Sequence, residues 1–205
     1  YTVDSPANPT EADAVFSAAT LTDGQTIKAI AFAEGYKPSA VASKKYTAGG
    51  ATSYFVKVTT APTDWSGTYL IVYETGNVAF DGSLAKLDVA ENTVAVTISE
   101  NKIEATDALM KSVFTIDGTA IKSASGKYIS GKTGSNSLIE STTKQDHTLS
   151  IDKNGNFSAV SNTSVLRYNS TSSIIKNKET GLRFRYYKAA SYSSQNDIQL
   201  YKLAN

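Results

Sequence analysis

The chain has 205 residues, a formal net charge of +1 and no cysteine. Its length allows one large domain or two small ones. The charge excludes electrostatic capture of nucleic acid or of an anionic membrane, and the lack of cysteine excludes disulfide frameworks, thiolate nucleophiles and cysteine-based zinc sites.

The first segment, residues 1–47, is patterned as a small β module. Residues 1–4 predict a short strand, and residues 26–32 alternate so that both faces of a strand can be covered. Turn residues occupy positions 35–38, and residues 41–46 predict the closing strand. Small residues with paired glycines at 48–52 then predict a linker.

The second segment, residues 53–205, is a succession of short strands separated by turn dipeptides such as Asp117-Gly118 and Asn154-Gly155. Strands are expected near residues 55–59, 68–74, 93–99, 102–105, 113–116, 120–123, 128–130, 137–141, 148–151, 157–160, 165–168, 173–176, 182–187 and 198–202. Only residues 108–111 are patterned as helix, for one turn. The predicted fold class is all-β: a small β module followed by a β-barrel module.

A faint repeat of about 35 to 38 residues favours a trefoil-like form of that barrel. Phe114-Thr115-Ile116-Asp117 and Leu149-Ser150-Ile151-Asp152 begin two of the matching units. In such a barrel the last strand, near residues 198–201, pairs with the first, near residues 55–58. Another β barrel or a sandwich is the alternative, because all strands share hydrophobic alternation.

Residues 1–47 also resemble a known family. The motifs that carry the resemblance are Tyr1-Thr2-Val3-Asp4, Pro9-Thr10, Thr26-Ile27-Lys28-Ala29-Ile30-Ala31, Gly35-Tyr36, Ser39-Ala40-Val41 and Tyr46. Together they resemble the chitobiase/β-hexosaminidase C-terminal-type domain, which implies a small immunoglobulin-like module beside catalytic or adhesive domains of secreted bacterial proteins. That domain begins with one or two strands before the Tyr-Thr start, so the resemblance implies an N-terminally incomplete copy.

Residues 53–205 look like a module of unassigned function from secreted Bacteroidetes proteins. The residues behind this resemblance are Phe55-Val56-Lys57-Val58, Trp65 to Tyr73, Arg185-Tyr186-Tyr187 and Ile198 to Lys202. It implies a secreted or cell-surface location and no catalytic residues.

Two short motifs match known sites in letters but not in context. Residues 126–133 fit the phosphate-loop pattern G-x-x-x-x-G-K-[ST], but a strand with flanking turns is expected because no helix can follow. Residues 152–156 resemble the start of a calcium loop, but the closing position is Thr163 instead of Glu, so a hairpin turn is expected.

The histidine and carboxylate residues that could carry out acid–base chemistry form no recognisable site in the sequence. His147 is the only histidine and lies in a polar stretch, so an exposed loop position is expected. Carboxylates such as Glu74, Asp81 and Glu100 are scattered over turns. No cofactor, metal site or catalytic residue is predicted, and a glycoside hydrolase ranks third among the functions.

Aromatic residues beside polar ones are the better functional signal. The candidate ligand-binding residues are Trp65, Arg183, Arg185, Tyr187 and Tyr192. Exposed rings can stack on sugar faces, although rings in β proteins also fill cores. The leading prediction is a non-catalytic accessory module that binds a polysaccharide or glycan, and the alternative is a protein-interaction or spacer module of a surface protein.

Overall fold

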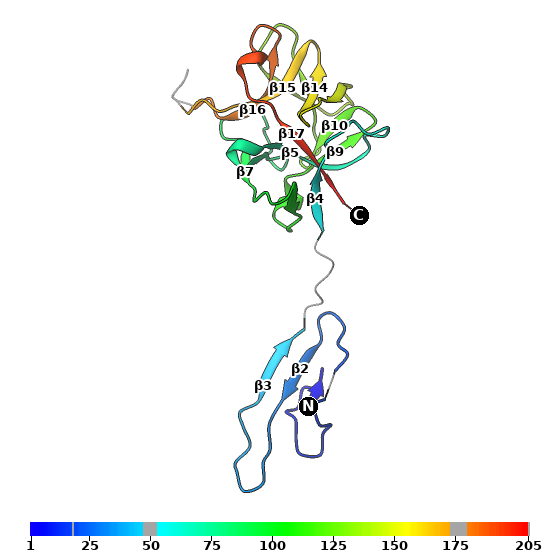
Figure 1. The fold of residues 1–205 in the computed structure, drawn as a ribbon, viewed down its shortest axis with the longest axis vertical. Coiled ribbons are helices and arrows are strands. Elements are labelled where there is room, and N and C mark those ends of the chain that lie inside the picture. The colour runs from blue at the N-terminus through cyan, green and yellow to red at the C-terminus, as the bar shows by residue number, and fades with distance from the viewer. Residues whose placement is uncertain (18, 47–52, 173–179, 205) are drawn as a thin grey trace. The chain divides into compact units, whose positions relative to one another are not determined.

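The computed structural model describes residues 1–17, 19–46, 53–172 and 180–204 (Figure 1). Within these ranges the regular structure consists of antiparallel strands and short 3-10 turns, so the all-β prediction is confirmed. The chain divides into two compact units, Tyr1–Thr52 (unit 1) and Ser53–Asn205 (unit 2). The predicted linker at 48–52 and the predicted strand at 173–176 lie outside the described residues.

Unit 1 is a three-stranded antiparallel sheet. Its order is β1 (Thr2–Val3), β2 (Thr26–Ala29) and β3 (Ala42–Lys45). Val3 pairs with Ile27, which in turn pairs with Lys44 on the other side. The described part of unit 1 forms a single sheet, whereas an immunoglobulin-like sandwich requires two facing sheets.

Unit 2 holds a ten-stranded and a four-stranded sheet. The main path of the larger sheet is β12 (Leu138–Ser141), β11 (Tyr128–Gly131), β10 (Ala120–Ser123), β9 (Phe114–Asp117), β5 (Gly67–Tyr73), β17 (Gln199–Leu203), β4 (Tyr54–Lys57) and β8 (Lys102–Glu104), while β6 (Val78–Phe80) pairs with β5 and β7 (Thr93–Ala95) pairs with β6. The smaller sheet is β13 (Thr148–Ile151), β14 (Phe157–Ser161), β15 (Ser164–Asn169) and β16 (Arg183–Lys188). The 3-10 turns are η1 (Glu74–Gly76), η2 (Leu109–Lys111) and η4 (Tyr192–Ser194).

The predicted pairing of the last strand with the first is confirmed. Lys202 of β17 lies opposite Val56 of β4, and β17 also pairs with β5 (Figure 1). The main path nevertheless ends at β12 and β8, and the pairings among the described strands form open sheets. Neither a closed barrel nor a trefoil is detected in them.

The centre of unit 2 is β5, which is buried on both faces. Tyr69 and Ile71 point into one hydrophobic cluster, and Leu70 and Val72 point into a second, as the two-residue period of a strand requires. The larger cluster joins the two sheets through aromatic rings. Phe80 stacks on Phe184 of β16 at 5.2 Å between centroids.

Candidate functional site

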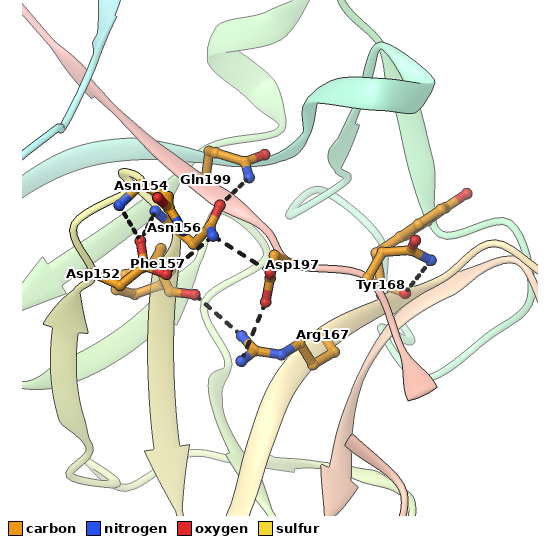
Figure 2. Close-up of polar contacts among 9 residues, drawn as sticks. Asp152, Asn154, Asn156, Phe157, Arg167, Tyr168, Asp197 and Gln199 are labelled. Carbon is orange, nitrogen blue, oxygen red and sulfur yellow. Dashed lines mark hydrogen bonds and ion pairs between the residues drawn. The ribbon is translucent and has the colours of Figure 1, made fainter. Parts of the chain in front are cut away.

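Polar side chains gather where the four-stranded sheet meets the segment that leads into β17 (Figure 2). The members are Asp152, Asn154 and Asn156 from the turn between β13 and β14, Arg167 from β15, Asp197 from the segment before β17, and Gln199 at the start of β17. We call these six residues the polar cluster. The backbone bond from Phe157 N–H to the Ile198 carbonyl, at 2.7 Å, holds the two chain segments together.

The turn itself is organised around the carboxylate of Asp152. Its Oδ1 accepts the backbone N–H groups of Asn154 and Asn156, both at 2.8 Å, and its Oδ2 accepts the Asn156 side-chain amide at 3.0 Å. Gly155 supplies the positive φ of +79° that this turn needs. Hydrogen bonding, above all from the Asn156 backbone, lowers the pKa of Asp152, so the exposed carboxylate stays ionised.

Asn156 connects the turn to β17. Its Nδ2 also donates to Asp197 Oδ2 at 3.3 Å, and its Oδ1 accepts from Gln199 Nε2 at 2.9 Å. The Gln199 side chain in turn accepts the backbone N–H of Glu74 at 3.3 Å. Each side-chain amide therefore has a fixed orientation, because its donor and acceptor ends are both used.

Arg167 forms the inner side of the polar cluster. Its Nη2 lies 3.4 Å from Asp197 Oδ1, its Nη1 donates to the Phe157 carbonyl at 3.4 Å, and its guanidinium lies over the Tyr192 ring at 5.7 Å. The Arg167 side chain is 12% exposed and that of Asp197 is 54% exposed. Asp197 is therefore the outward-facing partner of the pair.

One of the predicted ligand-binding residues, Tyr192, contacts the polar cluster, and a second, Trp65, packs on a core residue. Tyr192 on η4 contacts the polar cluster through Arg167. Trp65 is half-buried and packs against the core with its ring 6.1 Å from that of Phe157, the residue that follows the turn. Both residues are half-buried, and stacking on a ligand requires an exposed ring face.

The other three predicted residues lie along β16 and are more enclosed. Arg183 and Tyr187 are buried, and Arg185 Nε forms an ion pair with Asp88 Oδ1 at 2.6 Å. Arg183 also donates to the Thr180 carbonyl at 2.7 Å. The structure therefore brings these side chains together on one face of β16 but gives them intramolecular partners there.

His147 corrects a sequence-based expectation. It is buried, 6% exposed, instead of exposed in a loop. Its Nδ1 lies 3.0 Å from the Thr119 carbonyl and its Nε2 lies 2.6 Å from the Tyr186 hydroxyl. The prediction was wrong because the polar neighbours of His147 in sequence concealed a packing position between the β9–β10 turn and β16.

The two motif look-alikes behave as expected from their context. Tyr128–Gly131 is strand β11, and the chain continues into a turn instead of a helix, so no phosphate-binding helix N-terminus exists there. Residues 152–156 form the hairpin turn. Over the ranges that the structure covers, no group of three or more His, Cys, Asp or Glu side chains is placed to hold a metal ion.

The carboxylates of Asp152 and Asp197 share the Asn156 amide nitrogen as a donor. A glycosidase acid needs a raised pKa, whereas the pKa of Asp152 is lowered. Fixed, ionised carboxylates beside amides and a guanidinium are instead suited to accept hydrogen bonds from a ligand.

The sequence did not single out Asp152, Asn156 or Asp197 as members of a site. The turn was recognisable from Asn154-Gly155, but Asp197 lies some forty residues further on. The strand registers of β14, β15 and β17 bring the two together. No local motif encodes that register.

No family model, curated protein or solved structure matches the chain. In the part of the chain that the structure describes, no helix has the length and apolar character needed to cross a membrane.

Proposed function

We propose that this chain is a non-catalytic, secreted or cell-surface accessory module whose unit 2 binds carbohydrate at the polar cluster. One observation carries the proposal: the solvent-facing carboxylate of Asp197 lies beside Asn156 and Arg167, and the half-buried Tyr192 lies against the Arg167 guanidinium. The secreted location rests on the sequence resemblance.

The chemistry of sugars explains why this combination fits. A pyranose presents hydroxyl groups that donate and accept hydrogen bonds, and an apolar face of C–H groups. Planar carboxylates, amides and guanidinium groups hold hydroxyls in fixed directions, and flat rings cover the C–H face. Because bonds within the polar cluster already orient Asn156 and Arg167, little side-chain conformational entropy is lost when a ligand binds to them.

The test is binding of the full chain to a broad panel of glycans and polysaccharides, with Asp197→Ala as the main variant. A hydrogen bond to a charged group contributes about 1.5–3 kcal/mol, so we expect Asp197→Ala to weaken binding by about tenfold to a hundredfold. Asp107→Ala is the matched control, because Asp107 is an exposed carboxylate of unit 2 outside the polar cluster.

Trp65→Ala tests another aromatic residue that the sequence predicts to bind the ligand. The ring also packs on Phe157, so its removal lowers stability, and the unfolding midpoint must be measured alongside binding. Binding that survives both Asp197→Ala and Trp65→Ala in folded protein would contradict the proposed site.

Unit 1 favours a second candidate function, protein interaction. Phe16, Ile27, Ala29 and Ala42 line an apolar surface on its sheet. Lys44 and Lys45 stand on the edge strand β3, and such charges disfavour strand addition, so the sheet face is the candidate contact. A strictly monomeric mass in light scattering over a wide concentration range would count against self-association.

We also propose that residues 1–47 are immunoglobulin-like and that residues 53–205 are trefoil-like. The immunoglobulin-like character of residues 1–47 rests on their motifs, and the trefoil-like character of residues 53–205 rests on the faint repeat and on the pairing of β17 with β4.

A further inference from the structure

The charges at the surface of the polar cluster are arranged asymmetrically. The outward groups are the carboxylates of Asp152, an exposed residue, and of Asp197, whose side chain is more than half exposed. The guanidinium of Arg167 lies behind Asp197, with only 12% of the side chain exposed. An approaching ligand therefore meets hydrogen-bond acceptors that carry negative charge before it meets the fixed positive charge.

Among the described residues, the basic groups Arg167 and Lys57 near the polar cluster already have partners. Arg167 contacts the Asp197 carboxylate, the Phe157 carbonyl and the Tyr192 ring. Lys57, which approaches the turn at Gly155, forms an ion pair with Glu74 Oε1 at 2.7 Å. Neither cation is free to pair with a carboxylate or sulfate of a ligand.

Lys153 is the remaining cation of the turn, and it lies on the exposed side of the chain between Asp152 and Asn154. An ammonium group on an exposed, flexible side chain is screened by water and salt and contributes little to a fixed site. The two carboxylates, in contrast, are oriented by hydrogen bonds from Asn156.

We infer that the polar cluster is selective for neutral saccharides and discriminates against uronic acids and sulfated sugars, an inference that rests on the proposed function. An ionised carboxylate only accepts hydrogen bonds, so the ligand atoms that face Asp152 and Asp197 must donate them. Sugar hydroxyls and N-acetyl N–H groups do so. A sugar carboxylate or sulfate donates nothing and repels both aspartates.

The experiment uses matched ligands that differ only in carrying either a carboxylate or a primary alcohol at the same carbon. Binding of the full chain is measured to a panel of neutral glycans, to uronic-acid polysaccharides, and to the same polymers after their carboxyl groups have been reduced to alcohols. At low salt we expect each uronic-acid polymer to bind about threefold to tenfold more weakly than its reduced form, and added salt to narrow the difference.

Asp197→Asn separates charge from shape, because the amide keeps one acceptor oxygen for Arg167. We expect this variant to narrow the gap between each acidic polymer and its reduced form by about threefold, and Asp107→Asn to leave the gap unchanged. A preference for the acidic polymers, or an unchanged gap in Asp197→Asn, would overturn the inference and leave the proposed function standing. An absence of binding to every glycan would overturn the proposed function itself.

Discussion

The two units differ in what holds their strands together. In unit 1 the strands are hydrogen-bonded, yet Pro9 is the only buried residue among those described. In unit 2 the buried hydrophobic residues run from Phe55 to Tyr201 and form two clusters on either side of β5. Backbone pairing alone contributes little net free energy, so the difference shows that the apolar core of unit 2 supplies the stability of the chain.

The surfaces of the two units differ accordingly. Unit 1 leaves Val15 90% exposed and Tyr36 81% exposed, on loops that no core holds in place. Unit 2 sets its polar cluster on strands and a tight turn. A binding site is best preorganised on rigid elements, so this contrast favours unit 2 as the ligand-binding unit and unit 1 as a display or spacer element.

The largest expected loss of stability comes from truncating a core side chain. Phe80 is fully buried between Phe114 and Phe184, so Phe80→Ala should lower the free energy of unfolding by about 3–5 kcal/mol. Ile27→Ala on the half-buried face of unit 1 should cost about 1 kcal/mol or less. Chemical denaturation measures both, and comparable losses would break the distinction between the units.

A smaller loss of stability is expected from removing the hydrogen bond between β17 and η1. The Tyr201 hydroxyl donates to Glu74 Oε1 at 2.6 Å, and Glu74 is also the partner of Lys57. Tyr201→Phe removes this bond while keeping the buried ring, so we expect a loss of about 1–2 kcal/mol in unfolding free energy. A variant as stable as the wild type would show that Lys57 alone satisfies the Glu74 carboxylate.

A pH dependence is expected from His147. Burial lowers the pKa of His147 below its ordinary value of 6.5. The unfolded chain therefore takes up a proton at a higher pH than the folded chain, and stability is lost as the pH falls through and below 6.5 toward the folded pKa. Denaturation midpoints between about pH 7.5 and about pH 5.5 should fall more steeply in the wild type than in His147→Gln. Parallel curves would mean that His147 titrates alike in both states.

The smallest effect is expected from removing unit 1. A fragment of residues 53–205 should keep the unfolding free energy of the larger transition within about 0.5 kcal/mol, because the described core residues all lie in unit 2. A large destabilisation would show that unit 1 contributes to the core after all.

The sequence predicted strands well where alternation and turn dipeptides coincide. Residues 120–123 and 148–151 match β10 and β13, and residues 108–111 enclose the 3-10 turn η2. Strand β6 was missed because it is short and lies between the left-handed Asn77 and the turn at Asp81. Sheet order and the polar cluster depend on pairings between residues far apart in sequence, which a local pattern does not specify.

The candidate site was likewise predicted only in part from the sequence. Trp65 and Tyr192 were predicted as aromatic residues near polar ones, and Tyr192 contacts the polar cluster through Arg167, whereas Trp65 packs on Phe157. Arg183 and Tyr187 were predicted on the same grounds, but both are buried along β16. Residue types alone do not reveal which face of a strand is covered, so the sequence did not predict their burial.

The most direct test of the central claim is to compare glycan binding by the full chain, by residues 53–205 and by full-length Asp197→Ala in one panel. We predict that the full chain and the fragment bind the same glycans with equal affinity and that Asp197→Ala loses most of this binding. Binding that disappears with unit 1, or that persists undiminished in Asp197→Ala, would contradict the central claim.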